Sequence, residues 1–105
     1  MTGGETNDVE TAAIFSELYG VIEDRIAEHP DDSYTASLAH HEDGRHAVLE
    51  KLGEESTEVL LAATAEDPEA LTAEAADLVY HLFVLLASED VALEDLTAEL
   101  EDRRG

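Results

Sequence analysis

The feature that most constrains the fold is a long apolar stretch at residues 75–87, with the sequence AADLVYHLFVLLA. Asp67 and Pro68 stand two turns before it and match a helix N-cap followed by proline at the first helical position. A helix that is apolar on all sides is buried on most of them. The stretch therefore predicts a helix over about residues 68–88 that lies in the core of the fold.

Apolar residues recur at helical spacing in three further segments. They predict helices over about residues 9–28, 45–66 and 93–103, with Pro30 ending the first run and a short helix reaching to His41. The expected inner face of the second segment comprises Val48, Leu49, Leu52, Val59, Leu60 and Ala63. Without a strand pattern, the chain is predicted to be all-α, a small bundle of four to five helices. Residues 9–105 would form one domain, preceded by a disordered acidic tail over residues 1–8.

The connection before Pro68 is short, so the two helices that flank it are expected to pack antiparallel. The second of these carries more apolar surface than its short neighbours in one protomer can cover. A homodimer, intertwined through this helix, would bury the remainder.

Carboxylates repeat at one-turn spacing on both helices of this predicted hairpin. Glu54, Glu55 and Glu58 precede the turn, and Glu74 and Asp77 follow it at comparable distances. Spacings of three or four residues place side chains on one helix face, where like charges repel. Asp77 also lies inside the apolar stretch, where an unpaired buried charge would cost on the order of several kcal/mol. A bound Mg²⁺, which prefers oxygen ligands, would account for the pattern, although most acids of so acidic a chain simply face solvent.

Lys51 is the only lysine in the chain and lies one turn before Glu54 and Glu55. A phosphate ligand held beside the acids would explain its position. An ion pair with one of the two glutamates explains it equally well.

Composition narrows the classes of function. The 105 residues carry a formal charge of −22, which excludes a basic footprint for nucleic acid and disfavours anionic membranes. The chain has no cysteine, no apolar run of about 18 residues and a polar N-terminus, so we expect a cytoplasmic protein without a membrane helix. Abundant acid with almost no lysine is typical of halophiles that accumulate salt. Most of the charge is therefore expected to reflect habitat.

With these acids placed, the chain resembles the phosphoribosyl-ATP pyrophosphohydrolase family within the all-α NTP pyrophosphohydrolase superfamily. The resemblance covers about residues 18–103. It rests on SYT at 33–35, KLGEESTEV at 51–59, EAADLVYHL at 74–82, VLL at 84–86 and LEDL at 93–96. It implies Mg²⁺-dependent hydrolysis of phosphoribosyl-ATP to phosphoribosyl-AMP and pyrophosphate, the second step of histidine biosynthesis.

The resemblance also implies roles for individual residues. The positions that match the metal ligands are Glu55, Glu58, Glu74 and Asp77. Glu54 matches the leading glutamate of the motif and is the first candidate for the general base, while Lys51 would neutralise phosphate charge.

Candidates for substrate binding are Arg25, Ser33, Tyr34, Thr35 and His81. Each has a structural alternative: a surface ion pair for Arg25, a helix cap or turn for residues 33–35, and a core histidine bonded to Asp77 for His81.

Two other functions compete with this hypothesis. One is a different nucleoside triphosphate pyrophosphohydrolase of the same superfamily, with the same chemistry on another substrate. The other is a non-catalytic acidic helical dimer that serves as an interaction module.

Overall fold

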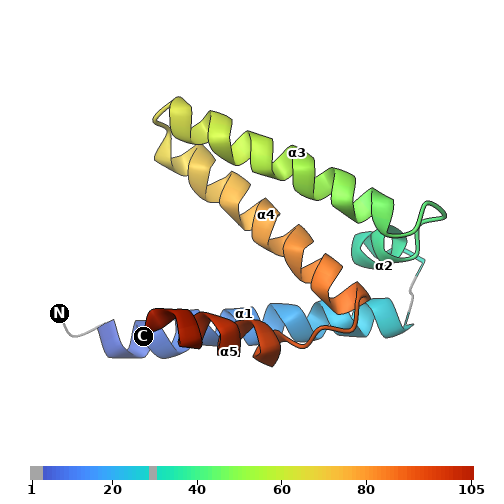
Figure 1. The fold of residues 1–105 in the computed structure, drawn as a ribbon, viewed down its shortest axis with the longest axis horizontal. Coiled ribbons are helices and arrows are strands. Elements are labelled where there is room, and N and C mark those ends of the chain that lie inside the picture. The colour runs from blue at the N-terminus through green and yellow to red at the C-terminus, as the bar shows by residue number, and fades with distance from the viewer. Residues whose placement is uncertain (1–3, 29–30) are drawn as a thin grey trace.

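The computed structural model describes residues 4–28 and 31–105 (Figure 1). Five helices make up almost all of this part: α1 (Gly4–Glu28), α2 (Tyr34–Ala39), α3 (Arg45–Thr64), α4 (Pro68–Ser88) and α5 (Leu93–Arg104). No strand occurs among the described residues, so the all-α prediction is confirmed.

The first helix begins earlier than predicted. Residues 4–8, expected to belong to a disordered tail, are helical in the structure. Residues 1–3 of the expected tail lie outside the described residues, as does Pro30, which was expected to end this helix.

The turn between α3 and α4 is fixed by caps on both sides. The amide of Asp67 donates to the carbonyl of Ala62, and that of Glu66 to Ala63, with Glu66 in the left-handed region at φ 57°. This is the Schellman pattern that satisfies the last carbonyls of a helix. The Asp67 carboxylate then accepts a hydrogen bond from the amide of Ala70 at 3.1 Å and caps α4, as its sequence predicted. The turn makes α3 and α4 an antiparallel hairpin (Figure 1).

All five helices contribute to one hydrophobic core. Its buried members are Tyr19 and Ile22 from α1, Leu38 from α2, Val48 from α3, Phe83 and Val84 from α4, and Leu93 from α5. The rings of Tyr19 and Phe83 meet edge to face with centroids 5.2 Å apart. The Tyr19 hydroxyl donates to the carbonyl of Val91 and joins α1 to the turn that precedes α5.

The far end of the hairpin lies away from α1 and α5 (Figure 1). The prediction that Leu49, Leu60 and Ala63 face inward on α3 is wrong for this protomer, since all three are exposed. Leu60 is 67% exposed and Leu61 63%. The physical reason is that α3 packs mainly on α4, so part of its apolar surface has no partner within the described chain.

Judged by length and hydropathy alone, α4 would be able to cross a membrane. It has 21 residues, and one window of 18 has a mean hydropathy of 1.5. No such helix was expected from the sequence, which has no apolar run of about 18 residues. Core helices of water-soluble proteins meet the same criteria. In this fold α4 contributes Phe83 and Val84 to the core, but only 17% of that window is buried, so the prediction that the helix is buried on most sides is wrong for one protomer.

Candidate functional site: an acidic metal centre

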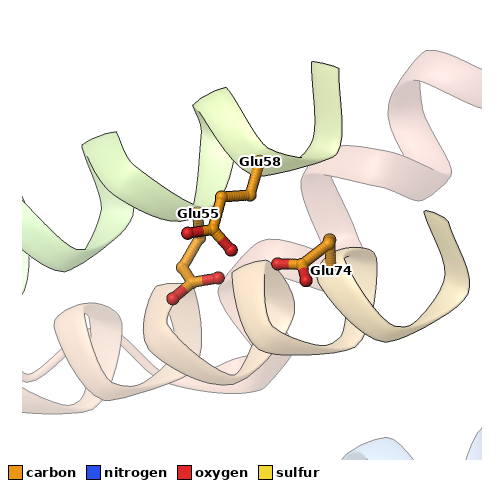
Figure 2. A group of neighbouring side chains, drawn as sticks. All are labelled: Glu55, Glu58 and Glu74. Carbon is orange, nitrogen blue, oxygen red and sulfur yellow. The ribbon is translucent and has the colours of Figure 1, made fainter. Parts of the chain in front are cut away.

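The hairpin brings three of the predicted metal ligands together. Glu55 and Glu58 of α3 and Glu74 of α4 each offer a carboxylate oxygen, and these oxygens lie within 4.8 Å of one another. Figure 2 shows the three side chains pointing toward one another across the space between the two helices. The spacing of the acids and the antiparallel turn allowed four acids to meet without establishing that they do, and the structure groups three of them.

Burial makes the cluster costly without a cation. Glu55 is only 7% exposed. One oxygen of Glu55 and one of Glu74 are buried and have no hydrogen-bond partner in the described structure. A proton shared with Glu58, burial, and repulsion from Glu58, Asp77 and Glu55 raise the pKa of Glu74 to about 7. Unpartnered buried oxygens among like charges are suited to a hard divalent cation, so the donor set fits Mg²⁺.

Asp77 differs from its prediction in one respect. It was expected to be buried inside the apolar stretch, but its side chain is exposed, because it lies on a side of α4 that no described element covers. It is not one of the three clustered carboxylates. Its charge nevertheless contributes to the raised pKa of Glu74, one turn earlier on α4. Asp77 therefore lies near the cluster, but the prediction that its carboxylate is buried is wrong.

Lys51 pairs with Glu54 on the surface of α3. Nζ of Lys51 lies 3.6 Å from Oε2 of Glu54, and the two side chains are 39% and 61% exposed. Interaction with Tyr34 and then with Glu54 raises the pKa of Lys51 above its ordinary value. The ion pair proposed as the structural alternative is therefore present, and it leaves the ammonium group one turn from Glu55.

His81 is buried and links two helices. Its Nδ1 lies 2.8 Å from the carbonyl oxygen of Asp77, and its Nε2 lies 2.8 Å from the hydroxyl of Tyr34. A carbonyl only accepts, so in the neutral ring Nδ1 carries the proton and Nε2 accepts from Tyr34. The bond to Asp77 thus involves the main chain rather than the carboxylate. His81 holds Tyr34 of α2 against α4.

The other predicted substrate contacts have structural roles or lie elsewhere. Ser33 caps α2, its hydroxyl accepting from the amide of Ala36 at 3.1 Å. Thr35 is buried, and its hydroxyl bonds to that of Tyr80 on α4. Arg25 is exposed in the last turn of α1, and none of the clustered carboxylates belongs to that helix. Contact of these three residues with substrate stays a prediction.

Sequence reasoning missed a pocket beside this cluster. It has a volume of about 410 Å³, lies between α2 and the first half of α3, and includes Lys51 and Tyr34 in its lining. Ser37, His41, Asp43 and Glu50 also line it. Its residues recur at helical spacing within each of the two segments, but the pocket forms only where the turn between α2 and α3 brings the segments together, so neither segment alone signals it.

Comparison with known proteins identifies the family. The sequence profile described as "Phosphoribosyl-ATP pyrophosphohydrolase" matches residues 15–104. The chain is 57% identical over 95 residues to "Phosphoribosyl-ATP pyrophosphatase" of Haloarcula marismortui, covering 90% of this chain and 97% of that one. It is 62% identical over 91 residues to the protein of that name from Natronomonas pharaonis, covering 87% and 90%. The protein of that name from Saccharolobus solfataricus is 48% identical over 91 residues, covering 87% and 95%.

These matches bear on both competing functions. A profile that spans most of the chain, and relatives that carry one name, support neither a non-catalytic module nor a different nucleotide substrate. The haloarchaeal relatives agree with the acid-rich, lysine-poor composition. The chain belongs to the phosphoribosyl-ATP pyrophosphohydrolase family and is a hydrolase of histidine biosynthesis.

Proposed function

We propose that Glu55, Glu58 and Glu74 hold the Mg²⁺ required for hydrolysis of phosphoribosyl-ATP to phosphoribosyl-AMP and pyrophosphate, with Asp77 as a fourth ligand. The observation that supports this most directly is the meeting of three carboxylates from two helices within 4.8 Å. The buried, unpartnered oxygens of Glu55 and Glu74 add to it. The proton on Glu74 and a divalent cation are alternative ways to relieve the same repulsion.

The residues around the cluster supply the rest of the chemistry. When bound, Mg²⁺ neutralises phosphate oxygens and lowers the pKa of a coordinated water. Lys51 exchanges its ion pair with Glu54 for the incoming phosphates, because a polyanion attracts the ammonium group more strongly than one exposed carboxylate. The exchange releases Glu54 from its ion pair. Glu54 then takes the proton from the attacking water as general base.

The ligand assignment is tested by Glu58→Gln, which removes one anionic oxygen and conserves shape. Glu58 is exposed, so the variant should fold normally, as judged by circular dichroism. We expect Mg²⁺ affinity to fall at least about tenfold and turnover to be abolished. Glu17→Gln on α1 is the matched control and should behave as the wild type. Near-normal Mg²⁺-dependent turnover in Glu58→Gln would refute the assignment.

Substrate choice is tested with a panel. Pyrophosphate release from phosphoribosyl-ATP should exceed that from ATP and from deoxynucleoside triphosphates at equal concentration. Comparable rates on a deoxynucleotide would favour the broader pyrophosphohydrolase activity. The biosynthetic role also supports a cytoplasmic location, where the nucleotide substrate is made.

The working unit is proposed to be a homodimer, joined through the uncovered face of α4. A groove of about 540 Å³ is lined mostly by apolar side chains of α1, α4 and α5, including Phe15, Leu82 and Leu100. A second groove of about 300 Å³ shares Phe15 and adds Ile14. On a surface this acidic, an apolar face of such extent is suited to a second copy rather than to solvent.

Leu100→Glu tests the dimer. Leu100 is 56% exposed, so a polar side chain there should leave the protomer folded. In molar KCl we expect sedimentation to show a dimer for the wild type and a monomer for Leu100→Glu. Arg104→Gln changes the charge of the same helix equally and should remain dimeric. A monomeric wild type would contradict this proposal.

A further inference from the structure

The pocket between α2 and α3 is lined by more negative than positive side chains. It is lined by the carboxylates of Asp43 and Glu50 and by the single ammonium group of Lys51. Lys51 is also paired with Glu54 at 3.6 Å. Even when Lys51 leaves Glu54 for a phosphate, a phosphate group placed in this pocket would meet two like charges and only one cation. The pocket disfavours phosphate and favours an uncharged, polar part of a ligand.

The hydrogen-bonding groups of the pocket are mainly acceptors. The Ser37 hydroxyl donates to the carbonyl of Tyr34 at 2.8 Å, which leaves its oxygen to accept. The Tyr34 hydroxyl donates to neutral His81, so its oxygen also accepts. Together with Asp43 and Glu50, these groups match a ligand that carries several hydroxyl donors, as ribose does.

Two further groups in the pocket are suited to bind a nucleobase. The ring of Tyr34 is about half exposed and offers an apolar face for stacking. Nδ1 of His41 lies 3.1 Å from the amide nitrogen and 3.6 Å from Oδ2 of Asp43, which leaves Nε2 as the ring nitrogen that can bond to a ligand. The volume of about 410 Å³ is within the range of about 300–1,000 Å³ that is typical of small-molecule sites.

The position of the pocket relates it to the acid cluster. Lys51 lines the pocket and stands one turn before Glu55 on α3, a rise of about 6 Å. A nucleotide of ordinary dimensions can span that distance with its phosphates at the cluster and its sugar in the pocket.

We propose that this pocket binds the nucleoside of phosphoribosyl-ATP, with ribose hydroxyls on Asp43 and Glu50 and the base on Tyr34. The proposal rests on the function proposed above and adds Asp43 and Glu50 as residues that determine specificity. They distinguish the ribose from the triphosphate that it carries, and the triphosphate is directed past Lys51 to the carboxylates of the hairpin.

The test is Glu50→Gln, which removes the charge of an exposed side chain and keeps its size, with Glu17→Gln as control. We expect KM for phosphoribosyl-ATP to rise about tenfold, because a charge-assisted hydrogen bond becomes a neutral one. The inhibition constant of AMP should rise in parallel. Turnover number, Mg²⁺ affinity and inhibition by pyrophosphate, which lacks a nucleoside, should stay at wild-type values. Asp43→Asn should shift KM in the same direction.

The sign of the change decides between ligands. If the pocket held a phosphate, removal of a repelling carboxylate would lower KM, and this outcome would overturn the proposal. Unchanged KM and AMP inhibition in both variants would overturn it as well. Failure of the wild type to hydrolyse phosphoribosyl-ATP would instead contradict the function itself, so the two failures are distinguishable.

Discussion

Glu74 is the member of the cluster whose pKa its neighbours raise. Its carboxyl group has Glu58 as a proton-sharing neighbour and Glu55 and Asp77 as further negative charges, which raise its pKa to about 7. A proton is thus the occupant of the cluster in acid, and a divalent cation can replace it near neutral pH. This competition makes both stability and metal binding depend on pH through one residue.

Glu74→Gln should reveal that competition, because its effect on the melting temperature should change sign when Mg²⁺ is added. Because the pKa is about 7 in the folded protein and 4.5 for an unperturbed carboxyl, the stabilising proton is fully present below pH 4.5. It is lost as pH rises through about 7. In metal-free protein at pH 8, Glu74→Gln should therefore raise the melting temperature, with little effect at pH 4.5. Saturating Mg²⁺ at pH 8 should reverse the order, since Gln is the poorer ligand. An equal difference under all three conditions would contradict the prediction.

Lys51 provides a second prediction at the scale of a residue. Lys51→Gln should lower turnover at least about tenfold, because phosphate charge is no longer neutralised. It should leave Mg²⁺ affinity unchanged or slightly tighter, since a cation beside the acids repels free metal. Its exposed ion pair with Glu54 is worth only about 0.3–0.5 kcal/mol.

The matched control for Lys51 is Arg103→Gln, which breaks the exposed pair between Arg103 and Glu99 at 3.2 Å on α5. Calorimetry and pyrophosphate release on both variants separate the roles. If Lys51→Gln leaves the rate of pyrophosphate release unchanged, as Arg103→Gln should, then Lys51 has only a structural role.

At the scale of helices, much of the fold was predictable because its signals are local. The cap at Asp67, Pro68 and the helical spacing of apolar residues predict α4 as observed, over Pro68–Ser88. The same hairpin register makes the meeting of Glu55, Glu58 and Glu74 possible without requiring it. Exposure was less predictable, since it depends on which neighbours cover a helix. An apolar stretch implied burial of Asp77, yet within one protomer that side of α4 is uncovered.

The attachment of α2 to α4 could not be predicted, because its partners are 45 and 47 residues apart in sequence. The buried Thr35 hydroxyl bonds to that of Tyr80. Thr35→Val should cost about 1–3 kcal/mol in the free energy of unfolding, since the Tyr80 hydroxyl is left unpaired. Thr35→Val with Tyr80→Phe removes both partners and should cost less than the sum of the single variants. Urea denaturation in molar KCl measures the cycle, and additive costs would show that the bond contributes nothing.

At the scale of the molecule, two opposing features meet. The chain carries a charge of −22, and its described part leaves large apolar side chains exposed, among them Phe15, Leu60 and Leu100. Apolar surface favours association, whereas like charge on two copies opposes it. Association is therefore expected only where salt screens the charge. Composition indicated the halophilic environment, but it could not locate the apolar face, which depends on how the hairpin sits on α1 and α5.

This balance leads to a prediction about salt. Lowering KCl from 1 M to 0.01 M lengthens the Debye length from about 3 Å to about 30 Å, so carboxylates on different helices begin to repel one another. The melting temperature should fall continuously over this range, and sedimentation should show dimer giving way to monomer before the helical circular dichroism is lost. Sucrose at equal osmolality is the control, because it stabilises proteins by exclusion from their surfaces but screens no charge, so the rise in melting temperature that KCl gives beyond sucrose measures screening. A melting temperature that is the same in molar and millimolar KCl would show that self-repulsion does not limit the stability of this fold.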